Sequence, residues 1–171
     1  MLFPRGPEVT LLGILELMDI VEELLHAAQA LDAAEVTYAV CGGLAVTIHG
    51  RPRLTIDIDL IVPASEMTQA IEAAARAGFD LPTGWVSLPE EGSGIRRLFR
   101  LTKAVENEFL TLDLLEVDSQ DNMLLADCER LELHGRAVPV LSKTSLIWMK
   151  TNSTRTKDRL DIELLSDEPE P

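Results

Sequence analysis

The strongest constraint on the fold is the stretch TIDIDLIV, residues 55–62, where two aspartates interrupt an apolar, β-branched segment. This composition predicts a β-strand over residues 54–62, closed by Pro63. Because side chains alternate along a strand, Asp57 and Asp59 share one face with Thr55 and Ile61. We expect the opposite face to lie in the core; it consists of Leu54, Ile56, Ile58, Leu60 and Val62.

Two carboxylates on one strand face repel each other, and burying them in the ionised form is costly unless a cation offsets their charge. Paired carboxylates are typical of Mg²⁺ sites in which the ion also binds a phosphate substrate. The alternative interpretation is that this face of the strand is simply exposed to solvent. The surrounding sequence decides between the two.

Hydrophobic periodicity predicts alternating helices and strands over most of the chain. The pattern indicates an α/β (α+β) fold with a mixed β-sheet, in a single domain over residues 1–165 and a disordered tail over 166–171. We expect helices at 10–33 (amphipathic), 44–50, 65–78, 143–152 and 156–165, strands at 36–41, 95–101 and 108–117, a loop at 81–94, and a hairpin over 130–141 that turns at His134 and Gly135.

Charge and hydropathy restrict the partners. The net charge of −14 argues against a surface that coats nucleic acid, because such binding needs clustered Lys and Arg. No segment is predicted to span a membrane, and the first ten residues do not have the pattern of a signal peptide, so we expect a cytoplasmic protein. We interpret a basic group formed by Arg96, Arg97, Arg100 and Lys103 as a solvated face.

Two further features join the paired aspartates. Gly42 and Gly43 follow a predicted strand and open a helix, where small residues and exposed backbone N–H groups allow a phosphate to approach. Asp113 lies in the middle of the apolar strand FLTLDLLEV, between leucines, where a charge is out of place. A glycine pair, two acids on the next strand and a third acid on a later strand therefore form one candidate site.

This constellation resembles the nucleotidyltransferase superfamily that includes DNA polymerase beta, with thirteen residues between Gly43 and Asp57. It is most similar to a small bacterial branch that includes nucleotidyltransferase-type toxins of abortive-infection (type IV) toxin–antitoxin systems. The motifs that carry this resemblance are GGLAV (42–46), HG (49–50), R-x-T (53–55) directly before DIDL (57–60), and K…R-x-K-D-x-x-D from Lys150 to Asp161.

The resemblance implies a mixed β-sheet nucleotidyltransferase core flanked by helices. It also implies transfer of a nucleoside monophosphate from a nucleoside triphosphate to an acceptor hydroxyl, with Mg²⁺ or Mn²⁺ held by the catalytic residues Asp57, Asp59 and Asp113. Leu44 stands where many members have a serine, so phosphate binding is expected to use backbone amides. The residues implied in nucleotide binding are Gly42, Gly43, Arg53, Thr55, Lys150, Arg155 and Lys157.

Several alternatives stay open at the level of the sequence. Lys157 with Asp161, and Arg155 with Asp158, stand at helical spacings at which they can form ion pairs with each other instead of binding substrate. The chain can also be a catalytically weak nucleotide-binding or interaction module of a toxin–antitoxin pair, with an antitoxin partner. A phosphatase with an aspartate nucleophile is a poorer match. The acceptor is tRNA, a protein hydroxyl or a small molecule.

Overall fold

The computed structural model describes residues 11–51, 54–88, 95, 97–105, 108–118, 122–151 and 155–166. Seven strands form one mixed sheet in the order β3-β4-β5-β2-β1-β7-β6. The strands are β1 (Ala39–Cys41), β2 (Asp57–Pro63), β3 (Leu81–Ser87), β4 (Arg97–Val105), β5 (Glu108–Val117), β6 (Cys128–Leu133) and β7 (Arg136–Leu141). The predicted α/β class with a mixed sheet is confirmed.

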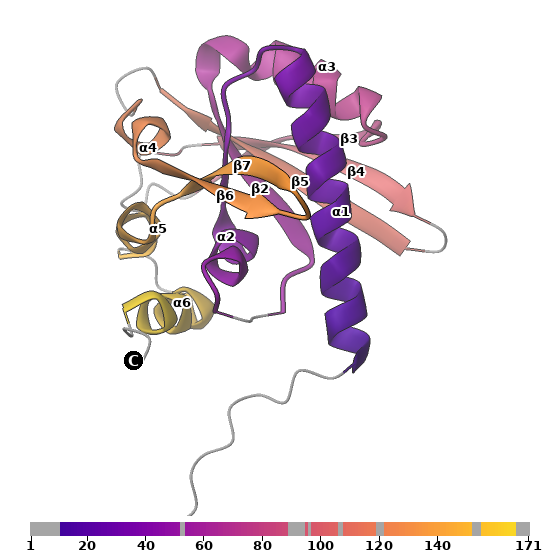
Figure 1. Ribbon diagram of the computed structural model, residues 1–171. Coiled ribbons are helices and arrows are strands. Elements are labelled where there is room, and N and C mark those ends of the chain that lie inside the picture. Colours follow the sequence, from indigo (N-terminus) through magenta and orange to yellow (C-terminus); the bar gives the residue numbers. More distant parts are fainter. Residues whose placement is uncertain are drawn as a thin grey trace, which may run out of the picture.

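The helices cover the sheet in two groups (Figure 1). In one group, α1 packs against α3, and both contact the strands; in the other, α2, α5 and α6 contact one another. The helical segments are α1 (Leu11–Ala33), α2 (Gly42–Ile48), the 3₁₀ turn η1 (Ala64–Glu66), α3 (Met67–Arg76), α4 (Asn122–Ala126), α5 (Lys143–Lys150) and α6 (Thr156–Ser166). Among the described residues, no helix is both long and apolar enough to span a membrane.

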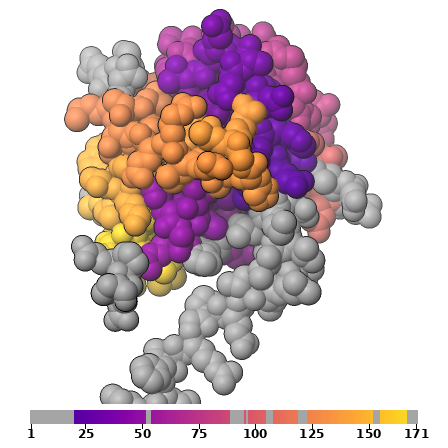
Figure 2. Space-filling view, viewed as in Figure 1, coloured from indigo at the N-terminus to yellow at the C-terminus, as the bar shows by residue number. Residues whose placement is uncertain are grey.

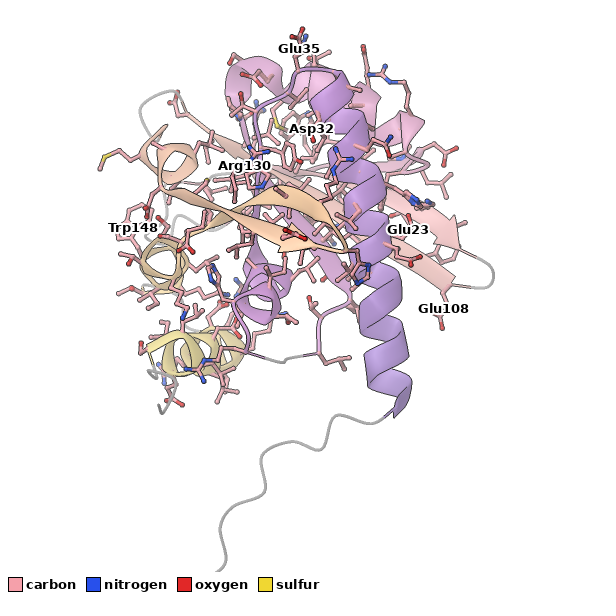
Figure 3. The ribbon with its side chains drawn as sticks, viewed as in Figure 1. Glu23, Asp32, Glu35, Glu108, Arg130 and Trp148 are labelled. Atoms are coloured by element: carbon pink, nitrogen blue, oxygen red, sulfur yellow. The ribbon has the colours of Figure 1, made fainter. Side chains whose placement is uncertain are left out.

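The core lies between the sheet and these helices. Leu24 and Leu31 of α1 are fully buried, as are Ile58 and Leu60 of β2. Beside them, the β6–β7 hairpin packs along α1, as Figure 2 shows in orange against indigo, and Arg136 donates a hydrogen bond to Asp32 across this contact. In Figure 3, Glu23 lies on α1 near the β4–β5 end of the sheet, where its carboxylate pairs with Lys103.

Several predicted boundaries need correction. The predicted strand 36–41 is shorter, because Glu35 adopts a left-handed conformation and Val36 N–H bonds to Leu31 O, which closes α1. The helix predicted from residue 44 begins at Gly42, immediately after β1. The short helix α4 was not predicted at all. Residues 167–171 of the predicted disordered tail lie outside the described residues.

The predicted core face of the aspartate strand is wrong at its start. Leu54 and Ile56 are 70% and 71% exposed. The strand itself begins only at Asp57, which is also where pairing with β5 begins, so no neighbouring strand covers the two preceding apolar side chains. Ile61 is buried although it was predicted to share the face of the aspartates, which shows that this half of β2 is covered on both faces.

The loop predicted over 81–94 is wrong for its first half, since residues 81–87 form β3. Pro82 and Gly84 argued against a strand, but β3 is an edge strand paired only with β4, and an edge strand tolerates proline. The pairing slips between these two residues. The predicted strand pair β4–β5, the hairpin at His134 and Gly135, and the two C-terminal helices are confirmed. Some of their bounds differ from the prediction: β4 spans 97–105 instead of 95–101, and α5 ends at Lys150 instead of residue 152.

Candidate active site

Register across the sheet aligns four chemically active side chains in one row. Asp59 of β2 stands opposite Asp113 of β5, Arg100 of β4 stands opposite Asp113, and Cys41 of β1 stands opposite Asp59. Paired positions on neighbouring strands project from the same face of a sheet. Asp57 precedes Asp59 by two residues and therefore lies on this face as well.

This row opens into a cavity of about 280 Å³. Strands β2 and β5 contribute acidic side chains to the cavity, α2 contributes its two glycines, and α5 and α6 contribute basic side chains. Val86, Leu98 and Leu115 line an apolar wall. Arg53 lies outside the described residues. The other nine residues predicted for the site all line this one cavity: Gly42, Gly43, Thr55, Asp57, Asp59, Asp113, Lys150, Arg155 and Lys157.

Gly42 is required by the position of Asp59. Its φ of +64° is a left-handed conformation that favours glycine, and a Cβ added there would lie only 2.0 Å from Asp59 Oδ2. The sequence suggested that the glycine pair leaves room for a phosphate. The structure shows a further reason at Gly42, which is that a side chain would displace the carboxylate.

The environment of the cavity raises the pKa values of two of its carboxyl groups, those of Asp59 and Asp57. Burial, followed by repulsion from Asp113 and Asp57, raises the pKa of Asp59 to about 7, while Lys150 and Lys157 oppose the shift. Burial and the charge of Asp113 raise the pKa of Asp57 as well, against the attraction of Arg100 and Lys157. Burial and the repulsion among the acids therefore disfavour the ionised forms of Asp57 and Asp59.

Arg100 is a site residue that sequence reasoning missed. Its guanidinium grips Asp113 with two hydrogen bonds, from Nε to Oδ1 at 2.8 Å and from Nη2 to Oδ2 at 2.7 Å. The predicted solvated basic face is wrong for Arg100, which lines the cavity, and for Lys103, which pairs with Glu23 of α1 and is mostly buried. Arg97 pairs with Glu116 but stays half exposed, as predicted, and Arg96 lies outside the described residues. Only the register of β4 against β5 identifies Asp113 as the partner of Arg100, and no sequence signal fixes that register.

Lys150 is held at the cavity by two buried acids. Its Nζ lies 2.8 Å from Asp158 Oδ1 and 2.8 Å from Asp161 Oδ2, and Arg155 Nε lies 2.7 Å from Asp158 Oδ2. The alternative that Arg155 pairs with Asp158 is thus observed. Asp161 pairs with Lys150 of α5. This network joins α5 to α6 and fixes the ammonium group beside the acids.

The donor set matches a hard divalent cation, since Asp57, Asp59 and Asp113 offer carboxylate oxygens in one cavity and their repulsion calls for positive charge. No three acidic, histidine or cysteine side chains within the described residues are arranged as a ready-made metal site. Asp113 is engaged by Arg100, so Asp57 and Asp59 are the candidate pair for binding a metal ion in this arrangement.

The fold is shared with solved nucleotidyltransferase structures. The complex of ANT(2'')-Ia with adenylyl-2''-tobramycin is 18% identical, with a TM-score of 0.57 over 86% of this chain and 87% of that one. The solution structure of the antibiotic-resistance factor ANT(2'')-Ia is 19% identical, with a TM-score of 0.60 over 86% and 83%. A Thermotoga maritima protein proposed to be a nucleotidyltransferase is 16% identical, with a TM-score of 0.52 over 72% and 78%. No protein-family model and no curated protein matches the sequence.

Replacing Gly42 should separate backbone strain from the loss of room for Asp59. Gly42→Ala should destabilise the protein by more than the roughly 1–2 kcal/mol expected of a left-handed alanine, because its Cβ meets the Asp59 carboxylate. Gly50→Ala is the matched control, since Gly50 also has positive φ (+83°) but nothing within 4 Å of an added Cβ. Urea unfolding of both variants measures the difference, and equal losses would contradict the assigned role of Gly42.

The raised pKa of Asp59 predicts that metal-free protein loses stability as pH rises. In the unfolded chain the carboxyl titrates near about 3.9, whereas in the folded state it titrates at about 7. Between these values the folded state holds a proton that the unfolded state does not, so the free energy of unfolding falls with increasing pH. In the presence of EDTA, Asp59→Asn should lose less stability than wild type between about pH 4 and pH 7. Identical pH profiles would exclude this electrostatic strain.

Proposed function

We propose that this protein is a nucleotidyltransferase that moves a nucleoside monophosphate from a nucleoside triphosphate to an acceptor hydroxyl. The observation that carries the proposal is the convergence of Asp57, Asp59, Asp113 and the Gly42–Gly43 turn on one cavity, in a fold shared with nucleotidyltransferases. The acceptor oxygen forms a bond to the α-phosphorus, the bond from that phosphorus to the bridging oxygen breaks, and pyrophosphate leaves with the electron pair.

Asp57 and Asp59 would hold Mg²⁺ or Mn²⁺, joined by Asp113. A bound divalent ion in such a site stabilises the charge that develops on the attacking and leaving oxygens. The carboxylates offer the oxygen donors that these ions prefer. Burial, together with repulsion among the carboxylates, raises the pKa of Asp59 and gives the cavity a second reason to take up a cation.

The remaining residues would bind and orient the substrate. Lys150, fixed by Asp158 and Asp161, lies beside the acids. Together with Arg155 and Lys157, it would offset the charge of the triphosphate. Backbone amides of Gly42 and Gly43 would donate to phosphate oxygens, and Thr55 and Arg53 would complete the nucleotide site. Asp113 would accept the proton of the acceptor hydroxyl, which requires an oxygen that is not engaged by Arg100.

A small cationic acceptor is the most consistent with the charge of the protein. The net charge of −14 attracts cations and repels nucleic acid, which disfavours tRNA. ANT(2'')-Ia, which has the same fold, was solved with adenylyl-2''-tobramycin, a nucleotidylated small molecule. We therefore place a polyhydroxylated amine first among the acceptors, ahead of a protein hydroxyl.

One observation favours a second candidate function. The grip of Arg100 on Asp113 keeps the third acid from acting as an unengaged ligand or base. A protein fixed in this arrangement would bind nucleotide yet transfer it slowly, as a nucleotide-binding or interaction module of a toxin–antitoxin pair would. Activity of the purified protein, toxicity on expression and capture of an antitoxin partner separate the two candidates.

Labelled substrates test the reaction. Protein incubated with Mg²⁺, each of the four nucleoside triphosphates and candidate acceptors should transfer label from the α-phosphate and none from the γ-phosphate. Asp57→Asn and Asp59→Asn should abolish transfer, because both remove metal ligands. Asp113→Asn should retain nucleotide binding and lower the single-turnover rate by about 10²- to 10⁴-fold, the usual contribution of a positioned base.

Asp80→Asn is the matched control for these variants, since Asp80 is exposed and does not line the cavity. It should transfer label at the wild-type rate. Transfer of γ-label would identify a kinase instead. Nucleotide binding without transfer to a small molecule, protein or RNA acceptor would favour the binding module.

A further inference from the structure

The pairing of Arg100 with Asp113 lies at the centre of the carboxylate row and differs from an ordinary surface ion pair. Asp113 is 4% exposed, whereas the Arg100 side chain is 39% exposed and reaches into the cavity from the neighbouring strand. Both carboxylate oxygens accept a guanidinium N–H, in the two-pronged geometry that is the strongest form of this contact. The buried Asp113 is therefore paired with an arginine that solvent and ligands can reach.

The position of Arg100 brings it into competition with a metal ion. Asp59 and Asp113 stand opposite each other on adjacent strands, so an ion that bridges them would lie close to the guanidinium. Two cations a few ångströms apart in a partly buried site repel each other more strongly than they would in bulk water. While Arg100 grips Asp113, it already supplies the positive charge that the row of acids requires.

A guanidinium that leaves Asp113 needs another planar or multidentate anion, and a phosphate group fits this geometry as well as a carboxylate does. Arg100 lines the same cavity as the glycine pair and Lys150, where the proposed triphosphate binds. Exchange of one anion for the other would free Asp113 as the phosphate arrives.

We infer that Arg100 exchanges its ion-pair partner during nucleotide binding. It pairs with Asp113 while the cavity is empty, and it moves to a phosphate of the bound triphosphate so that Asp113 can bind metal. This inference rests on the proposed nucleotidyl transfer. It assigns Arg100 a positioning role and makes the binding of metal and of nucleotide mutually dependent. The two candidate functions then differ in one step, which is whether Arg100 releases Asp113.

Arg97 provides a matched control from the same two strands. It grips Glu116 with the same geometry, from Nε to Oε1 at 2.7 Å and from Nη2 to Oε2 at 2.9 Å. Because Arg97 and Arg100 are three residues apart on β4, they lie on opposite faces of the sheet, and Arg97 does not line the cavity. Removing Arg97 also deletes a two-pronged ion pair, but it does so away from the site.

The test is calorimetric titration of Mn²⁺ into the nucleotide-free protein. Arg100→Gln should bind Mn²⁺ about tenfold or more tightly than wild type, because Asp113 becomes available and a repelling charge is removed. Arg97→Gln should match wild type. An Mn²⁺ affinity of Arg100→Gln that is equal to or below that of wild type would overturn the inference.

Two further titrations test whether the gain in Mn²⁺ affinity acts through Asp113, and whether Arg100 changes partner when a triphosphate binds. In an Asp113→Asn background, Arg100→Gln should improve Mn²⁺ binding by a smaller factor, because only the removal of the repelling charge still contributes; an undiminished gain would mean that Arg100 acts only through long-range charge and would overturn the inference. With saturating α,β-methylene triphosphate, the difference in Mn²⁺ affinity between wild type and Arg100→Gln should shrink, because the phosphates give Arg100 another partner. A difference that persists unchanged would refute the exchange.

Failure of this inference can be told apart from failure of the proposed function. If neither wild type nor Arg100→Gln binds Mn²⁺ through Asp57, as judged by Asp57→Ala, the metal-dependent function itself is wrong. If Mn²⁺ binding depends on Asp57 but not on Arg100, only the inference falls. Should Arg100→Gln fail to fold, Arg100→Lys keeps the charge without the two-pronged grip and should still increase Mn²⁺ affinity, by a smaller factor; no increase in that variant would overturn the inference.

Discussion

Repulsion among three carboxylates in one cavity is the constraint on which the rest of this site depends. Asp57 and Asp59 occupy alternate positions of a buried strand, and the pairing of β2 with β5 places Asp113 beside them. Such a group is stable only where cations or donors surround it. The structure supplies them from three separate elements: Arg100 on β4, Lys150 on α5 and Lys157 on α6.

The fold makes this concentration of charge possible by separating the two faces of the sheet. Helices α1 and α3 bury Ile58 and Leu60 on one face, which anchors β2 through apolar packing instead of through its acids. The other face stays open at the start of β2, where the cavity forms. Gly42 completes the arrangement, because only a residue without a side chain leaves room for the Asp59 carboxylate. One face of β2 thus packs in the hydrophobic core, and the opposite face holds the acids of the candidate site.

Local patterns in the sequence were sufficient to predict the class of fold and the glycines and acids of the candidate site, whereas its basic residues and Thr55 were predicted from the family resemblance. The glycine pair, the two aspartates at a spacing of two and Asp113 between leucines each break a local pattern, and nine of the ten residues predicted from them and from the resemblance line one cavity. Long-range pairing was not predictable in the same way. The grip of Arg100 on Asp113 depends on strand register, and β3 is a strand because β4 offers an edge, in spite of Pro82 and Gly84. The exposure of Ile56 likewise follows from where β5 begins to pair.

The position of a bound metal ion tests the central claim most directly. Crystals grown with Mn²⁺ and an α,β-methylene nucleoside triphosphate would locate the ion by its anomalous scattering. We predict manganese within about 2.1 Å of carboxylate oxygens of Asp57 and Asp59, a typical distance for a small divalent ion, with the triphosphate against Gly42 and Gly43. Manganese bound outside the cavity, or a triphosphate that avoids the glycine pair while the acids bind no ion, would contradict the assignment of this site to nucleotidyl transfer.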